Sequence, residues 1–497
     1  MKADASLSIP RPPLDGMGRG MTLPFKVISF PLLLTAALWS ISTFPISFTA
    51  ALCAFLMILL PWWSYCVWKN GAQQEFPLFP MVGAMYVVAY ALPLFLGQHL
   101  GKTSHGPRVL APQAIDNTMM LAVFGVVALG AGMTLRIPWG MTSGRMLEFD
   151  ERPAAWNIVR FIFIVTALMA IGLGIGGMGE GGRQILVDLE SVVAMVAFLA
   201  LFRRFLRGQA GQTDQLLLLG FVLLRLGGGV ASGWLGAVVW FLIVMGVCYF
   251  DVRRSVPTAA IIGILIVVLF LQPGKTEFRK HYWHGIGNVS GTVTERTLYW
   301  LEASARAWSG ALDRPEKRSE LFGVTVSRAS LLEPTAMVVQ MTPSQVPYQH
   351  GKLYKYLVIT WIPRALWPDK PSFSEANQFY QVAYGITDRK DLNKVSMAVG
   401  ALTESYINFG WLGPPTVMLI VGLILNLVRR YFLDAEQGEF LHCVGLALLP
   451  TLMVIESQLA QYLSGIVQAI LLTVLVFLPA LRLVRAAGNK QIPTGSA

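Results

Sequence analysis

Long apolar runs alternate with short polar segments along most of the chain. A helix needs about 20 mainly apolar residues to cross the hydrocarbon core of a bilayer. Runs of this kind occur at about 26–43, 46–68, 78–98, 117–138, 156–176, 183–202, 215–233, 234–250, 257–272, 411–428, 440–457 and 462–481. The pattern therefore predicts an all-α polytopic membrane protein with about twelve transmembrane helices.

Basic residues between these runs predict the orientation of the helices. With a cytoplasmic N-terminus, most Lys and Arg of the short segments fall inside, and the short outer loops carry only Lys102, Arg108 and Arg183. This asymmetry follows the positive-inside rule. The expected order is a cytoplasmic tail (1–25), helices 1–9 (26–272), one large extracytoplasmic loop (273–410), helices 10–12 (411–481) and a second cytoplasmic tail (482–497).

Composition agrees with a membrane protein and argues against several other classes. The chain has 497 residues, of which 54% are hydrophobic and 13% charged, against about 25% charged in ordinary soluble domains. Its formal charge of +11 is explained by topology-setting Lys and Arg, so no nucleic-acid partner is expected. The four cysteines lie in apolar runs without metal-ligand spacing, and no phosphate-binding loop or zinc-protease motif occurs. We therefore expect no metal and no cofactor.

The predicted outer loop, residues 273–410, is mildly basic and rich in aromatic residues, unlike a disordered linker. Its segment from Thr294 has apolar side chains at helical spacing, such as Leu298, and predicts an amphipathic helix at the membrane surface. The segment from Tyr354 has an apolar run that Pro363 interrupts before it could cross the bilayer. That segment predicts a re-entrant or interfacial element. We expect the functional groups to lie mainly in this loop.

Arg225 is a candidate anion ligand because it lies deep in an apolar span, where a charge is costly. Three glycines follow it, and an arginine beside glycine amides is suited to phosphate or pyrophosphate. The alternative is a structural pair with a buried acid such as Glu190 or Glu456, in which the glycines permit close helix packing. The sequence leaves both interpretations open.

The loop supplies further cations, of which Arg364 is the strongest candidate. It lies between two prolines and between Trp361 and Trp367, so its backbone is restrained and its guanidinium preorganised. Lys370 follows closely, and Arg328 stands in the segment VSRAS. For most single loop arginines, solvation or lipid headgroup binding is the commoner role.

Two residues are the preferred candidates for a general base. Glu404 stands in GALTESYINFGWLGPP at the outer mouth of the tenth span, where partial burial makes a carboxylate a stronger base. His350, in VPYQHGKLYKY, is the second choice. The alternatives are a helix-terminal acid satisfied by a local arginine for Glu404 and a hydrogen-bonded structural group for His350. Other acceptors in the loop are His281, His284, Glu333 and Asp369.

Two segments of the loop together resemble a known family. GKLYKYLVITWIPRALWPDKPSF, followed after an interval by GALTESYINFGWLGP and an apolar span, is similar to the Wzy-type oligosaccharide repeat unit polymerases of bacterial surface polysaccharide assembly. The resemblance covers residues from about 318 to 428. It implies a GT-C-like fold in the bacterial inner membrane and a metal-independent glycosyl transfer at the periplasmic face. A glycan on undecaprenyl pyrophosphate is transferred there to another lipid-linked repeat unit, which builds an O-antigen, capsule or exopolysaccharide.

The candidate residues fit the chemistry that this resemblance implies. A lipid pyrophosphate leaving group needs fixed cations, and attack by a sugar hydroxyl needs a base. The cation candidates are Arg225, Arg328, Arg364 and Lys370, and the base candidates are Glu404 and His350. The aromatic residues expected to stack on sugar rings are Trp361, Trp367 and Tyr406. The implied partners are undecaprenyl-pyrophosphate-linked glycans and membrane lipid, with a chain-length regulator and a flippase of the same pathway.

Three other functions remain open at this point. An O-antigen ligase shares the donor and differs in the acceptor. A transporter or lipid-linked oligosaccharide flippase also has twelve spans with both termini inside, but such carriers usually have short outer loops. A structural scaffold for polysaccharide export would tolerate the loss of any single Arg or Glu.

Overall fold

The computed structural model describes residues 22–484 except for 43, 72–74, 98–99, 104–105, 136–145, 171–188, 234, 283–290, 313–325, 327–328, 358–361, 363–366, 368–374, 393–398 and 435–437. The elements before residue 273 are α1 (Thr22–Ile41), α2 (Phe48–Asn70), α3 (Leu78–Tyr86), η1 (Val87–Ala91), α4 (Leu92–Leu96), β1 (Leu100–Thr103), β2 (Gly106–Val109), α5 (Pro112–Thr134), β3 (Met146–Phe149), α6 (Pro153–Ala170), η2 (Leu189–Val193), α8 (Ala194–Leu206), α9 (Gln212–Ser232), α10 (Leu235–Arg253) and α11 (Thr258–Leu271).

The predicted outer loop contains short helices. They are α12 (Lys275–Tyr282), α13 (Val293–Leu312), α15 (Leu332–Met341), η3 (Lys352–Leu357), α16 (Glu375–Ala383), η4 (Arg389–Asp391) and α17 (Gly400–Phe409). The C-terminal elements are η5 (Gly410–Leu412), α18 (Gly413–Val428), η6 (Arg429–Leu433), α19 (Glu439–Met453), α20 (Leu459–Phe477), η7 (Leu478–Ala480) and β4 (Leu481–Val484).

The protein is an all-α polytopic membrane protein. Within the described residues, seven helical runs are long and apolar enough to cross a membrane: Phe48–Asn70, Leu78–Leu96, Pro112–Thr134, Gln212–Ser232, Leu235–Arg253, Gly400–Leu433 and Leu459–Ala480. The bent pair α11 and α12 makes an eighth if it counts as one span. Helices also lie over the other predicted ranges, namely α1, α6, η2 with α8, and α19. Their apolar parts include Val27–Ile41, Pro153–Met169 and Glu439–Met453, which have only 10–17 residues each.

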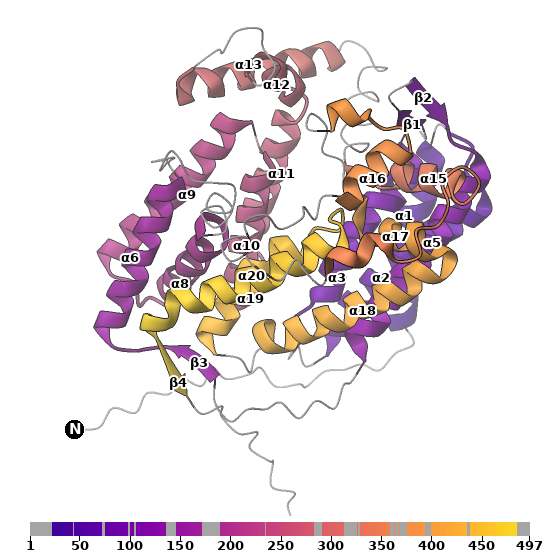
Figure 1. The fold of residues 1–497 in the computed structure, drawn as a ribbon. Helices are drawn as coiled ribbons and strands as arrows, with labels where there is room; N and C mark the ends of the chain where they lie inside the picture. Colours follow the sequence, from indigo (N-terminus) through magenta and orange to yellow (C-terminus); the bar gives the residue numbers. More distant parts are fainter. Residues whose placement is uncertain are drawn as a thin grey trace, which may run out of the picture.

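Two groups of helices stand side by side, and α19 and α20 lie between them (Figure 1). One group holds α6 and α8–α11, and the other holds α1–α5 and α15–α18. Helix α19 packs on α8 and α10 of the first group and on α3 of the second. The closest pairing is α5 with α18, where Gly132 and Gly422 face each other. Small residues at such a crossing let two helix backbones approach closely within a membrane.

Helices α12 and α13 lie across the ends of α9 and α11 (Figure 1). The indole N–H of Trp300 on α13 donates to the carbonyl of Leu271 at 2.9 Å. Arg296 Nη1 donates to the carbonyl of Ala231, near the end of α9, at 3.4 Å. The last carbonyls of a helix have no intrahelical partner, so these side chains satisfy them. The amphipathic helix predicted from Thr294 is therefore α13, and its side chains donate hydrogen bonds to backbone carbonyls at the ends of α9 and α11.

Two short antiparallel strand pairs occur in the described structure, and the apolar pattern predicted neither. Strands β1 and β2 form a hairpin before α5, with Leu100 opposite Val109. Strands β3 and β4 pair the segment between α5 and α6 with the chain that follows α20, and Met146 lies opposite Val484. The second pair ties the end of the last helix to the first half of the chain.

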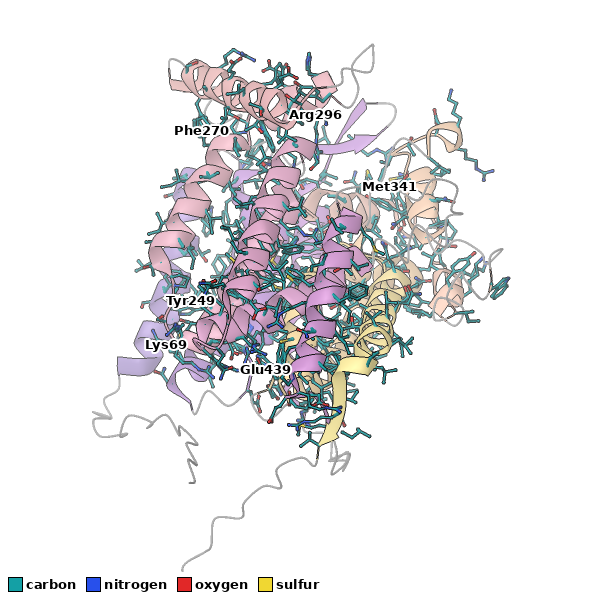
Figure 2. All side chains as sticks on the ribbon, turned by 90° about the vertical axis from the view of Figure 1, so that its left-hand side faces the viewer. Lys69, Tyr249, Phe270, Arg296, Met341 and Glu439 are labelled. Carbon is teal, nitrogen blue, oxygen red and sulfur yellow. The ribbon has the colours of Figure 1, made fainter. Side chains whose placement is uncertain are left out.

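A network of buried charges joins α8, α10 and α19 at the end of the bundle opposite α13, where Figure 2 labels Glu439. Arg203 on α8 is only 6% exposed. Its Nε donates to Glu439 Oε1 at 2.6 Å, and its Nη1 pairs with Asp251. Asp251 also lies 3.1 Å from His442 Nε2, and Arg207 Nη2 lies 2.9 Å from Glu439 Oε2. Loss of Arg203 would leave the largely buried carboxylates of Asp251 and Glu439 with less positive charge nearby to offset their negative charge.

We predict that Arg203→Ala destabilises the protein by about 3–5 kcal/mol, the usual effect of removing one partner from a buried ion pair. Thermal unfolding of the purified protein in detergent would show this as a lower midpoint. Arg253→Ala is the matched control, because that side chain is exposed at the end of α10 and its removal should hardly change the midpoint. Equal midpoints for Arg203→Ala and the unaltered protein would show that the network does not hold the three helices together.

Candidate functional site at helix α17

Helix α17 carries a row of fully buried polar residues. Thr403, Glu404, Ser405 and Asn408 all have 0% of their surface exposed. The helix lies among α15, α18 and α20 (Figure 1), and it also contacts the 3-10 turn η3. Ionisable and polar groups inside a membrane protein are costly, and they are usually paired or functional. The row therefore marks α17 as the candidate site.

Glycines at both ends let the chain turn into and out of this buried helix. Gly400 has a φ of +75°, and its N–H donates to the carbonyl of Glu456 at 2.8 Å. A Cβ at Gly400 would lie 2.5 Å from the carbonyl oxygen of Ile455. Gly410 has a φ of +61° and ends α17 before α18 begins. Glycine adopts positive φ at little cost, so these two residues determine where α17 starts and stops.

The carboxylate of Glu404 caps the start of α20. Its Oε2 accepts a hydrogen bond from the backbone N–H of Leu459 at 2.7 Å. A helix N-terminus stabilises negative charge because its first N–H groups are unpaired and the helix dipole is positive there. The observed partner is thus a backbone amide rather than the local arginine that the sequence left open. The other oxygen, Oε1, is buried and has no hydrogen-bond partner among the described residues.

Tyr354, on the turn η3, brings a second buried polar atom near Glu404. Its hydroxyl has no hydrogen-bond partner within the described part of the chain. Burial, and then the negative charge of Glu404, raises the pKa of Tyr354 well above its ordinary value. The hydroxyl therefore stays protonated and can donate a hydrogen bond. A hydroxyl donor and an unpaired carboxylate oxygen are together complementary to a sugar hydroxyl, which accepts one hydrogen bond and donates another.

A chain of hydrogen bonds also reaches α17 from the span Leu78–Leu96, the third of the predicted runs. The Tyr90 hydroxyl lies 3.2 Å from Thr335 Oγ1, which in turn lies 2.7 Å from Thr403 Oγ1. Tyr90 belongs to the π-turn η1, where the carbonyl of Ala89 accepts the N–H of Leu331 at 2.9 Å. Such turns interrupt the regular helix bonding and are frequent at functional sites. The start of α15 is thereby anchored to the third span beside Thr403.

His350 lies near the other end of α17. Its φ is +47°, and its backbone N–H donates to the carbonyl of Asn408 at 2.9 Å. The residue is exposed, and its ring stands edge-on to Tyr348 with centroids 6.5 Å apart. The structure thus brings both predicted bases to one helix, with Glu404 in its middle and His350 at its C-terminal end.

Arg225 lies on α9, in the other group of helices from α17 (Figure 1). Its guanidinium carbon is 5.0 Å from the centre of the Phe221 ring. The three glycines after Arg225 continue α9 to Ser232. Their amides therefore take part in helix hydrogen bonding and do not form the anion cradle that the sequence suggested.

Trp367 and Tyr406 are the described members of the predicted sugar-stacking set. Trp367 is exposed, whereas Tyr406 is buried and packs edge-on against Tyr348 with ring centroids 6.1 Å apart. Stacking of a sugar on Tyr406 would require this ring to be uncovered. The other predicted residues, Arg328, Trp361, Arg364 and Lys370, lie outside the described residues.

Four residues of this site were not predicted from the sequence, namely Tyr354, Tyr90, Thr335 and Thr403. One signal was present, because the polar run Thr403–Ser405 is unusual in a segment that leads into an apolar span. Tyr90 and Thr335 are 245 residues apart in the chain, and no local pattern connects them. Only the tertiary structure brings them together.

We predict that Gly400→Ala destabilises the protein by at least about 1–2 kcal/mol, because a side chain opposes the positive φ. The added methyl group would also press on the carbonyl of Ile455. Thermal unfolding midpoints in detergent measure the effect. Gly220→Ala on α9 is the matched control, since no heavy atom lies within 4 Å of its added Cβ. If Gly400→Ala unfolds no earlier than this control, the described start of α17 is wrong.

Comparison with known proteins identifies a family and two partial relatives. The chain is 30% identical over 128 residues to the O-antigen polymerase of Salmonella typhimurium, and equally to that of Salmonella typhi. Each match covers 24% of this chain and 30% of the relative's length. No solved structure matches. Residues 111–440, more than half of the chain, match the family described as Domain of unknown function (DUF8712), and the protein belongs to that family.

Proposed function

We propose that this protein is a membrane glycosyltransferase that polymerises undecaprenyl-pyrophosphate-linked oligosaccharide repeat units into an O-antigen, capsule or exopolysaccharide. The partial match to two O-antigen polymerases supports this class. The observation that carries the proposal is Glu404, a fully buried carboxylate with one oxygen bonded to Leu459. Its other oxygen lacks a hydrogen-bond partner in the described part of the chain. An oriented carboxylate of this kind suits proton abstraction from a sugar hydroxyl.

The proposed reaction takes place at the periplasmic face of the bacterial inner membrane. The proposed topology is a GT-C-like fold with twelve spans. Both termini are cytoplasmic, and residues 273–410 face the periplasm. The distribution of Lys and Arg along the sequence supports the orientation. Each of the twelve predicted ranges carries a helix, and seven described runs, or eight with the bent pair, are long and apolar enough to cross a membrane. A flippase and a chain-length regulator of the same pathway are the proposed partners.

The proposed chemistry starts at the acceptor hydroxyl. Its oxygen attacks the anomeric carbon of the donor glycan, and its proton passes to Glu404 Oε1. Tyr354 orients this hydroxyl by a hydrogen bond, which holds the oxygen toward the donor. The bond between the anomeric carbon and the pyrophosphate oxygen breaks, and undecaprenyl pyrophosphate leaves with the electron pair. His350 is the alternative base.

The leaving pyrophosphate gains negative charge in this step, and fixed cations stabilise it without a metal in the proposed mechanism. Arg364 is the first candidate because its neighbouring prolines and tryptophans restrain it. The other proposed cations are Arg328 and Lys370; Arg225 lies on α9, in the other group of helices from α17, and would act only on a donor that reaches across to it. The proposed sugar-stacking residues are Trp361 and Trp367, together with Tyr406 once its ring is uncovered.

We predict that Glu404→Gln lowers the polymerisation rate by about 10²–10⁴-fold, because glutamine cannot take the proton. Its side-chain oxygen can still accept the hydrogen bond from Leu459, so the variant should fold and insert normally. Each variant is expressed in a strain that lacks the gene, and the surface glycan is resolved by electrophoresis. Arg364→Ala should lose polymer in the same way.

Glu456→Gln is the matched control for this experiment, because it removes an exposed acid at the turn before α20. That variant should make polymer of normal length and amount. Immunoblots of the membrane fraction check that all variants reach the same level. Normal polymer in both Glu404→Gln and Arg364→Ala would refute the site assignment.

Deletion of the gene in its host separates the polymerase from its alternatives. Surface glycan and undecaprenyl-linked intermediates are resolved by electrophoresis and mass spectrometry. We expect single repeat units to persist while long polymer disappears. Long polymer left on the outer-face lipid would instead identify a ligase, and repeat units trapped on the cytoplasmic side would identify a flippase.

A further inference from the structure

A groove runs between α10, α11 and the segment that joins α2 to α3. Its volume is about 460 Å³, and the residues that line it are mostly apolar. The lining on α10 extends from Val239 to Asp251, and Arg254 follows directly after the end of α10. At 1.5 Å per residue the part on α10 is roughly 18 Å of helix, more than half the thickness of a hydrocarbon core. None of the lining residues belongs to α15, η3 or α17, so the groove is separate from the candidate site.

The groove exists because α11 stands partly apart from the other helices. Of the residues of α11, only Leu271 at its end is buried, and its main packing contact is with α13. Ile261 and Leu265 line the groove and are still about half exposed. A helix that is apolar all round suits a lipid environment. The groove is therefore open to the hydrocarbon of the membrane along α11.

One end of the groove carries charge. Glu75, Asp251 and Arg254 are the ionised residues of its lining. Glu75 pairs with Arg429, and Asp251 pairs with Arg203, so both acids are largely neutralised by other residues. The Arg254 side chain is 56% exposed, and its nearest acid oxygen, on Asp251, is 3.7 Å away. The rim therefore presents a guanidinium to an incoming anion.

We propose that this groove binds an anionic phospholipid from the adjacent leaflet. One acyl chain lies along α10 and α11, and the phosphate meets Arg254. The apolar wall and its length match an acyl chain, and basic pockets between transmembrane helices on the cytoplasmic side suit anionic headgroups. The choice of a phospholipid over a polyprenyl donor rests on the proposed orientation, in which the donor pyrophosphate belongs at the face opposite Arg254. Binding of the phospholipid itself does not require glycosyl transfer.

Gly246 offers a direct way to fill the groove. It belongs to the lining on α10, and no heavy atom lies within 4 Å of an added Cβ. A leucine at this position would project into the space proposed for the acyl chain. Gly263 on α11 is the matched control, because it also has open space around an added Cβ but does not line the groove.

The test is native mass spectrometry of the purified full-length protein with phosphatidylglycerol or phosphatidylcholine of the same acyl composition. We expect Gly246→Leu to lower phosphatidylglycerol binding by about tenfold, because the leucine and the acyl chain would compete for the same space. Gly263→Leu should bind as the unaltered protein does. Arg254→Gln should lower the preference for phosphatidylglycerol over phosphatidylcholine by about fivefold, as expected for one basic residue near an anionic headgroup.

Three outcomes would overturn the proposal. The first is equal phosphatidylglycerol binding by Gly246→Leu and the unaltered protein. The second is equal binding of the two phospholipids to the unaltered protein. The third is displacement of phosphatidylglycerol by an equal concentration of undecaprenyl phosphate, which would assign the groove to a polyprenyl chain. Size-exclusion profiles and circular dichroism establish that the three variants are folded, and Arg254→Gln tests the headgroup site independently of the glycines.

Discussion

Helix ends that lie inside a membrane protein have no water to bind, so their backbone groups must find partners within the chain. Much of this architecture depends on how that requirement is met. The first amide of α20 is bonded to Glu404, and the end of α11 is bonded to Trp300. The π-turn in the third span uses the carbonyl of Ala89 to hold Leu331. Short helices such as α17 can begin and end in the interior because these partners are present.

The need for buried polar groups to find partners also distinguishes the structural charges from the candidate site. At one end of the bundle, Arg203 is bonded to acids from two other helices, so the charges compensate one another and fasten α8, α10 and α19. At α17, Glu404 uses one oxygen as a helix cap, and Tyr354 keeps a protonated hydroxyl nearby. A buried polar atom left without a partner is expensive, and an active site is a common reason to retain one.

Two different lipids are proposed to bind this protein, one beside the outer loop and one in the groove along α10 and α11. The proposed donor is a polyprenyl pyrophosphate, whose headgroup belongs beside the outer loop. The groove along α10 and α11 carries its charge at the other end, at Arg254. Helix α11 packs mainly on α13. The groove and the outer loop are therefore joined through α11 and α13, although their proposed ligands would approach from opposite leaflets.

Local sequence determined where the long apolar helices of this protein lie. In a bilayer, an apolar run of about 20 residues has few stable alternatives to a helix, because its backbone must bond to itself. The same local logic predicted α13 and selected Glu404 and His350, which both lie at α17. It could also recognise that Arg225 is deeply placed in an apolar span. It could not place Arg225 relative to α17.

The tertiary structure alone decided which helices are neighbours. It put Arg225 and α17 into different groups of helices, which sequence reasoning had combined into one site. It also joined Tyr90, Thr335 and Thr403, and it paired β3 with β4 across most of the chain. Apolar periodicity reports whether a segment can enter a membrane. It does not report which polar side chain will meet another, because that depends on how whole helices pack.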